Sequence, residues 1–236
     1  MEHLGKTNPN YDYFIKDGKE GHKSKTTIAE KDFGVIMDPN LNFDTHINET
    51  IKKANKVAGL INRSIVNKYD NVMIPLFKAL VRPILEYGNV VWSPHLKKHK
   101  ESIENVQRRF TKRVIGISTM SYEERLKQLR LPSLEYRRFR GDLIEVFKIV
   151  HNFYDPATTN NLFTFSDVDS TRGHNLKLKM RTTNTTLFNK FFTNRIIKAW
   201  NKLTTEAVNA SSLNAFKNSI DRYFKDSIHS VNLDFI

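Results

Sequence analysis

Basic side chains on two predicted helices are the residues whose types and spacing point most directly to a chemical role. On each helix they lie away from the stripe of apolar residues, so they are free to pair with the phosphates of a nucleic-acid backbone. The predicted phosphate contacts on these helices are Lys52, Lys53, Lys56, Arg108, Arg109 and Lys112. Two alternatives stay open: the cations only keep the helix solvated, or Arg108 pairs with Glu104 one turn earlier.

A third helix is predicted after Ser133, and its first turns contain Arg137, Arg138 and Arg140. Cations are unfavourable near a helix N-terminus because the helix dipole is positive there. Their position therefore predicts contacts that offset this penalty, and Arg137 and Arg138 join the predicted nucleic-acid-binding residues. A plain surface role is the alternative for each of them.

Residue patterns that support catalysis or metal binding are sparse. The chain has no glycine-rich phosphate loop, no Gly-x-Ser-x-Gly elbow and no His-Glu-x-x-His motif. His95 and His99 have metal-ligand spacing, but no glutamate accompanies them and the flanking lysines repel cations, so a solvated pair is predicted. Asp167 and Asp169 lack a third carboxylate nearby and are interpreted as part of a turn. We therefore predict no catalytic residue, metal, cofactor or small-molecule substrate.

Composition favours a polyanionic partner. Lysine and arginine number 38 against 25 acidic residues, a formal charge of +13, which suits a nucleic acid or an anionic membrane. The chain has no cysteine, which excludes disulfides and thiolate metal sites and is compatible with a reducing compartment. The amino terminus has no apolar signal core, and no run of eighteen apolar residues occurs. The expectation is an intracellular protein, nuclear or cytoplasmic, without a membrane partner.

Three helical segments must position the basic residues. Residues 44–65 show the cleanest periodicity, and Asp44 is the predicted N-cap. The segment 72–92 is apolar on most sides, and Pro83 is predicted to kink or split it. The segment 96–115 is amphipathic, and its apolar face is formed by Ile103, Val106, Phe110 and Val114.

Capping residues mark the ends of further helices. Ser121 with Glu124 predicts a capping box, while Ser133 and Ser211 are predicted N-caps of a long helix and of the last helix. Gly116 is a predicted C-cap after the basic helix. Residues 155–190 are polar and poorly periodic, which predicts long loops and one strand near 176–180.

The first forty residues have a β pattern, with a hairpin signal at Asp17-Gly18. A hairpin with so little chain before it is marginally stable alone, so we expect the chain to begin within a larger domain. The predicted fold is mainly α, with a small antiparallel β-hairpin or sheet confined to these forty residues.

Several stretches coincide, in order, with one family. They are HLGK at 3–6, EKDFGV at 30–35, LVRPILEY at 80–87, VWSP at 91–94, ENVQRRFTK at 104–112, SYEERL at 121–126, LPSLEYRR at 131–138, RGDL at 140–143, RGH at 172–174, FFTNR at 191–195 and AWN at 199–201. In these motifs the chain resembles the C-terminal part of non-LTR (LINE-type, jockey-like) retrotransposon reverse transcriptases. Phe33 and the pair Leu203-Thr204 depart from the family pattern, where Leu and Leu-Pro are usual.

The resemblance implies a division of the chain and a role for it. Residues 1–40 correspond to a remnant of the palm, 41–155 to a helical thumb-like domain, and 156–236 to C-terminal loops and helices. The family's catalytic aspartates belong to a palm turn upstream of 3–6 and so lie outside this chain. The thumb packs along the template–primer duplex, which implies an RNA–DNA or DNA duplex backbone as the partner.

Four hypotheses follow from the residues and the resemblance together. The first is a nucleic-acid-binding C-terminal fragment of a reverse transcriptase that is not an enzyme by itself. The second is a protein-interaction or adaptor module derived from a mobile element, and the third is a truncated copy without function. The fourth, a working polymerase, requires metal-binding carboxylates that the sequence does not reveal. The oligomeric state stays open.

Overall fold

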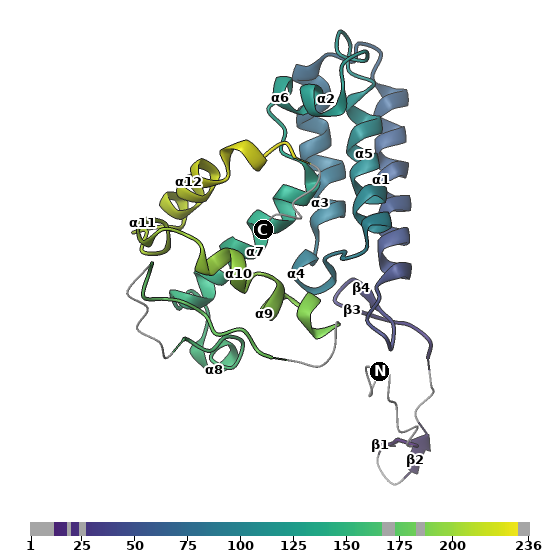
Figure 1. The fold of residues 1–236 in the computed structure, drawn as a ribbon. Helices are drawn as coiled ribbons and strands as arrows, with labels where there is room; N and C mark the ends of the chain where they lie inside the picture. Colours follow the sequence, from purple (N-terminus) through teal and green to yellow (C-terminus); the bar gives the residue numbers. More distant parts are fainter. Residues whose placement is uncertain (1–11, 18–19, 24–26, 167–172, 183–186, 231–236) are drawn as a thin grey trace.

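The computed structural model describes residues 12–17, 20–23, 27–166, 173–182 and 187–230. Within these ranges the fold is mainly α, and its strands all lie before residue 40, which confirms the predicted fold class. Residues 70–150 are described without a gap and contain helices but no strand. The protein is therefore a helical body that carries two small hairpins at its N-terminal end (Figure 1).

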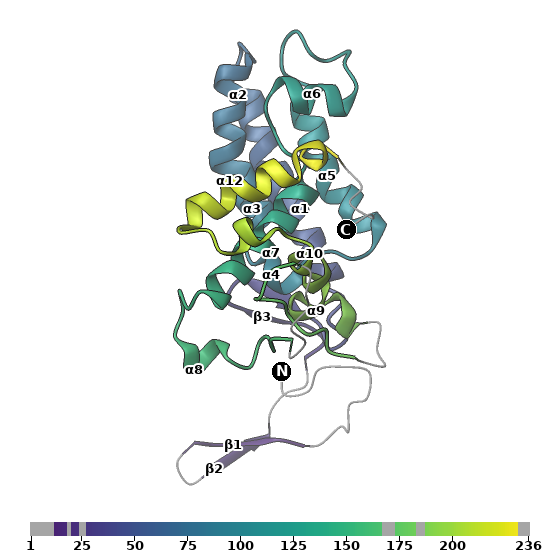
Figure 2. The same cartoon turned by 60° about the vertical axis from the view of Figure 1, so that its left-hand side comes forward.

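The two hairpins are antiparallel and differ in their surroundings. Strand β1 (Phe14–Asp17) pairs with β2 (Glu20–Lys23), and Figures 1 and 2 both show this hairpin extending away from the helices. Strand β3 (Glu30–Asp32) pairs with β4 (Val35–Met37), which lies against the first helix. The second hairpin is thus the one that joins the helical body.

The turn between β3 and β4 consists of Phe33 and Gly34, both with positive φ. Two residues of this kind match the right-handed twist of hairpin strands. Tyr87 donates a hydrogen bond of 2.8 Å to the carbonyl of Phe33, and a Cβ on Gly34 would lie 3.1 Å from the Tyr87 ring. The turn is therefore fitted closely against the helical body.

Helix α1 (Asp44–Ser64) begins one residue earlier than a cap at Asp44 would place it. Phe43 occupies the N-cap position with φ 60°, and its side chain cannot accept a hydrogen bond. The Asp38 carboxylate accepts the amide of Phe43 at 2.8 Å instead. The prediction of Asp44 as N-cap is therefore wrong. The Asp38 carboxylate accepts the amide at the start of the helix, so the Asp44 side chain can make another contact.

The apolar segment after α1 is divided into four pieces. They are α2 (Asp70–Leu76), a π-helical turn η1 (Phe77–Val81), α3 (Arg82–Glu86) and α4 (Asn89–Trp92). Pro83 has no N–H to continue the α-helical ladder, and a wider π turn precedes it. The helix is distorted before Pro83 but not split there, since residues 70–86 stay helical through the π turn and the first interruption lies at Tyr87 and Gly88.

Helix α5 (Lys97–Thr111) runs beside α1 in the same direction. His99 of α5 contacts Asp44 at the start of α1, and the amide of Ile115 donates to the carbonyl of Lys68 beyond the far end of α1. With α2–α3 as the third rod, these helices enclose a first hydrophobic core that contains Ile47, Phe77, Leu85, Trp92, Ile103 and Phe110.

Helix α6 (Tyr122–Gln128) closes one end of this body, and α7 (Leu134–Val150) leaves it. The capping box of Ser121 and Glu124 and the cap by Ser133 are both present, as predicted. The C-cap of α5 is Lys112, so the prediction of Gly116 as C-cap is wrong. Gly116 lies in a turn beyond this helix, with φ 85°.

A second hydrophobic core forms around the C-terminal half of α7. Phe147 stacks on Phe216 at 4.3 Å between ring centroids, and Trp200 packs beside them. Leu134 of α7 belongs to the first core and Leu143 to the second. The division between the cores therefore runs through α7, whereas the sequence placed the domain boundary at 155/156.

Short elements build the rest of the second unit. They are α8 (Pro156–Thr159), η2 (Phe188–Lys190), α9 (Phe192–Arg195), α10 (Ile197–Asn201), α11 (Thr205–Val208), α12 (Leu213–Tyr223) and η3 (Lys225–Ser227). Ser212 rather than the predicted Ser211 caps α12, accepting the amide of Ala215 at 3.1 Å. The strand predicted near 176–180 is reduced to one bridge between Phe165 and Leu178.

Two asparagines replace a strand partner for this loop. The Asn201 side chain accepts the amide of Leu178 and donates to its carbonyl, both at 2.9 Å. The Asn194 side chain bonds the amide and the carbonyl of Arg181 in the same way, at 3.2 and 3.0 Å. The loop's backbone is therefore satisfied partly by side chains of α9 and α10, beside its backbone hydrogen bonds to residues 164–166.

A buried carboxylate joins α5 to α6 and to the start of α7. Glu104 of α5 is 1% exposed, and it accepts hydrogen bonds from the Tyr122 hydroxyl at 2.5 Å, from the amide of Leu134 at 3.0 Å and from the amide of Glu135 at 3.3 Å. The last two amides are at the start of α7, where the helix dipole favours a negative charge. Burial nonetheless raises the pKa of Glu104.

We expect Glu104→Ala to destabilise the protein by roughly 2–4 kcal/mol, because it leaves buried donors of α6 and α7 without an acceptor. Urea unfolding followed by circular dichroism measures this. Glu101→Ala is the matched control, since Glu101 is on the same helix in an exposed pair with Lys97 at 3.9 Å, and a change within about 0.5 kcal/mol is expected. Equal effects of the two substitutions would contradict the role given to Glu104.

Candidate nucleic-acid interface

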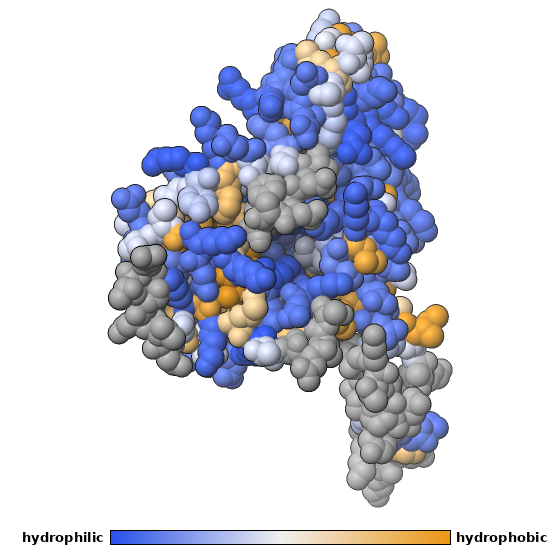
Figure 3. All heavy atoms as spheres, viewed as in Figure 1, coloured by the Kyte–Doolittle hydropathy of each residue, from blue (hydrophilic) through white to orange (hydrophobic). Residues whose placement is uncertain are grey.

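The exposed sides of α1 and α5 carry four of the predicted phosphate contacts. Lys52, Lys56, Arg109 and Lys112 are all exposed, and Figure 3 shows hydrophilic residues over this side of the molecule. Among the described residues, only Lys52 of these four has an ion-pair partner, Glu49 at 2.8 Å. An exposed pair of this kind is weak, so it does not prevent Lys52 from meeting a phosphate.

Three of these cations lie at the same height on the two helices. Asp44 and His99 are in contact at 2.6 Å and mark a common level, from which both helices run in the same direction. Lys56 is 12 residues beyond Asp44, while Arg109 and Lys112 are 10 and 13 residues beyond His99. At 1.5 Å per residue all three lie roughly 15–20 Å from that level. Lys56, Arg109 and Lys112 therefore lie at one height on neighbouring helices, and this set of three exposed cations is here called the α1–α5 band.

Arg108 points to a different side. It is half-buried, bonds the side chain of Asn105 and lies 4.8 Å from the centre of the Tyr122 ring, between α5 and α6. The alternative pair of Arg108 with Glu104 is wrong, because Glu104 faces inward toward α7. Arg108 thus contributes positive charge to a groove beside α6 and does not belong to the α1–α5 band.

Lys53 is likewise separated from its neighbours in sequence. It lines a groove between α1, α3 and the β3–β4 turn, together with Glu49, Pro83 and Tyr87. Successive residues of a helix differ by about 100° in direction, so Lys52 and Lys53 cannot serve one surface equally. The structure therefore does not bring the six predicted cations into a single row.

The two arginines predicted on α7 lie partly or fully inside the protein. Arg137 forms two hydrogen bonds with the Glu86 carboxylate, one of them at 2.8 Å, and Arg138 is 3% exposed. Arg140 is held by Asp221 at 2.6 and 2.7 Å. The contacts predicted to offset the helix-dipole penalty are thus hydrogen bonds to carboxylates, for Arg137 and for Arg140. The assignment of Arg138 as a contact to duplex phosphates is wrong, because its side chain is buried.

One exposed cation of this region was missed by the sequence reasoning. Arg113 follows Lys112 directly, is exposed, and forms no ion pair within the described part of the chain. It lies beyond the end of α5 and so escaped a search based on helical faces. Its adjacency to Lys112 was the available signal.

The residues with metal-ligand spacing do not form a metal site. His99 is buried and its Nε2 lies 2.6 Å from the Asp44 carboxylate, so the predicted solvated pair is wrong for this residue. Burial and the nearby charge of Lys190 lower the pKa of His95. Asp167 and Asp169 lie outside the described residues, and those that are described contain no cluster of three potential ligands.

Comparison with known proteins gives one similarity. An uncharacterized protein of Caenorhabditis elegans, B0403.1, is 26% identical over 128 residues, which cover 51% of this chain and 61% of that protein. The chain thus matches less than two thirds of the length of this relative. No family model and no solved structure matches the chain. Within the described residues every helix is too short or too polar to span a bilayer.

We expect a variant with Lys56, Arg109 and Lys112 replaced by alanine to bind duplexes with a weaker dependence on salt. The slope of log affinity against log salt should fall by about one unit for each phosphate contact that the variant removes. Fluorescence anisotropy with an RNA–DNA duplex at several salt concentrations measures the slope, and circular dichroism checks helicity.

The matched control replaces Lys198, Lys202 and Arg222, which are three exposed cations of the second unit. It removes the same charge from another surface, so its slope should stay close to that of the wild type. If both triple variants lower the slope equally, general charge rather than the α1–α5 band governs binding.

Proposed function

We propose that the chain binds the sugar–phosphate backbone of an RNA–DNA or DNA duplex through the α1–α5 band. The observation that carries this proposal is the band itself: exposed cations at one height on two neighbouring helices, with no ion-pair partner among the described residues. The surplus of 13 positive charges supports it, because it favours association with a polyanion. A nucleic-acid partner also suits an intracellular location, nuclear or cytoplasmic.

Contacts of this kind position a protein on a duplex but carry little sequence information. Binding should therefore be nearly independent of base sequence. If about six phosphates are neutralised, affinity should fall roughly a thousandfold between 50 and 200 mM salt. Arg108 and Lys53 lie in separate grooves, and we infer contacts from them only for a duplex that reaches those grooves.

We further propose that the chain is the C-terminal part of a non-LTR retrotransposon reverse transcriptase, on the basis of the motifs quoted from its sequence. In that assignment residues 41–155 serve as the thumb, and the chain works together with a palm that it does not itself contain. Its contribution is to hold the duplex, since two-metal phosphoryl transfer needs carboxylates that belong to the palm.

A protein-docking role is the second candidate, and one observation favours it. Val66, Tyr69 and Ile115 are exposed apolar residues, and the hydrogen bond from Ile115 to Lys68 brings their two loops together. Apolar docking at this end of the bundle should change little with salt, whereas duplex binding should weaken steeply. The salt dependence of binding therefore separates the two roles.

We expect no DNA synthesis from the isolated chain. The physical reason is that none of its motifs supplies the paired metal-binding carboxylates that the reaction requires. A primer-extension assay with magnesium or manganese measures this. Reproducible extension that is abolished by substituting a residue of this chain would overturn the expectation.

A further inference from the structure

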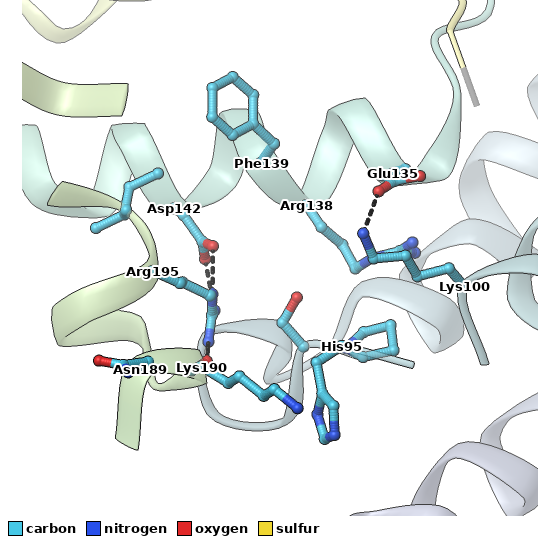
Figure 4. A pocket seen from close by; sticks show the side chains of 12 residues that line it. His95, Lys100, Glu135, Arg138, Phe139, Asp142, Asn189, Lys190 and Arg195 are labelled. Atoms are coloured by element: carbon cyan, nitrogen blue, oxygen red, sulfur yellow. Dashed lines mark hydrogen bonds and ion pairs between the residues drawn. The ribbon is translucent and has the colours of Figure 1, made fainter. Parts of the chain in front are cut away.

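A cavity of about 370 Å³ lies between the two helical units, away from the α1–α5 band (Figure 4). Its walls come from the loop between α4 and α5, from α5, from α7 and from the segment η2–α9. The volume falls within the range of roughly 300–1,000 Å³ that is usual for small-molecule sites. Polar and charged side chains form much of the lining, which points to a charged ligand.

Arg138 supplies the decisive feature of this cavity. Its side chain is 3% exposed and lines the cavity from α7, and its Nη1 and Nη2 atoms are buried without a hydrogen-bond partner among the described residues. Figure 4 shows the guanidinium reaching from α7 toward Lys100. A buried group that keeps unsatisfied donors is unfavourable, because it has lost its hydrogen bonds to water. An acceptor from a bound ligand would remove this penalty.

The carboxylates around the cavity are already occupied by other cations. Glu135 accepts the Lys100 ammonium at 2.6 Å, and Asp142 accepts two hydrogen bonds from Arg195, at 2.8 and 3.0 Å. Figure 4 shows both pairs at the cavity wall. These carboxylates and Glu104 attract the charge of Arg138, but none of them accepts a hydrogen bond from its Nη1 or Nη2. These donors of Arg138 thus remain for a ligand.

The lining as a whole is positive. Four cations, Lys100, Arg138, Lys190 and Arg195, face two carboxylates, which leaves a surplus of two positive charges. Lys190 of η2 extends toward His95 in Figure 4 and forms no ion pair within the described part of the chain. The site therefore combines a planar, bidentate donor with a point charge and suits a tetrahedral dianion.

We propose that this cavity binds a phosphate group, either free inorganic phosphate or the phosphate of a mononucleotide, with Arg138 as its bidentate donor and Lys190 as a second cation. The site joins α7 of the first unit to η2 and α9 of the second. Binding there therefore stabilises the contact between the two units. The proposal stands independently of duplex binding by the α1–α5 band.

Thermal unfolding and isothermal titration calorimetry of the full chain, at constant ionic strength, test the proposal. The probes are inorganic phosphate, a nucleoside 5′-monophosphate and the same nucleoside without phosphate. We expect phosphate at about one hundred times its Kd to raise Tm by roughly 5 °C or more. Arg138→Met should abolish this rise, and Arg222→Met, which removes an exposed arginine of α12, should leave it unchanged.

Lys190→Met provides a second variant in case Arg138→Met does not fold, because Lys190 is only partly buried. We expect it to weaken phosphate binding about tenfold or more, as for the removal of one charge-assisted hydrogen bond. Tighter binding of the mononucleotide than of phosphate supports the proposal and assigns a nucleotide, and the reverse order supports it and assigns the free anion. Absence of any phosphate effect on the wild type, an equal effect on Arg138→Met, unchanged affinity of Lys190→Met, or equal binding of the bare nucleoside would each overturn it.

Discussion

The buried carboxylate of Glu104 at the start of α7 is the interaction on which the arrangement of this protein depends. It accepts donors from α6 and from the first turn of α7 while it belongs to α5. Because α7 carries residues of both hydrophobic cores, fixing its N-terminus also fixes where the second core begins. A charge buried in this way is favourable only while its donors surround it. A different packing of α5, α6 and α7 at this junction would therefore be unfavourable, because it would remove these donors from Glu104.

Other polar contacts between α7 and distant elements lie farther along this helix. Arg137 reaches Glu86 of α3, Asp142 holds Arg195 of α9, and Arg140 holds Asp221 of α12. Each joins elements that are distant in sequence, at positions where apolar contacts alone would leave the relative orientation of the helices loosely specified. Breaking one partner of such a pair costs more than the pair contributes, because the remaining charge is left without a partner.

Most residues that carry the resemblance to retrotransposon proteins serve this architecture. Asp142 of RGDL meets Arg195 of FFTNR, Asn194 of the same motif bonds a loop backbone, and Asn201 of AWN bonds another part of that loop. His174 of RGH lies 3.1 Å from the Trp200 carbonyl. These contacts therefore hold the second unit together, while Arg109 and Lys112, from the motif ENVQRRFTK, lie exposed at the proposed interface.

The sequence by itself determined the features that depend on local chemistry. Apolar spacing predicted the long helices, and Ser121, Glu124 and Ser133 predicted their caps, because each effect acts within one or two turns of chain. Tertiary structure alone decided which cations reach solvent. Arg109 and Arg138 look alike in sequence, yet one is exposed and the other buried, because only packing decides which helix faces another element covers. The partner of His99 was missed because Asp44 lies 55 residues away along the chain, whereas the cap of α1 by Asp38 is a local contact that was overlooked. Burial and partners over long sequence distances are properties of the folded chain, and no local pattern encodes them.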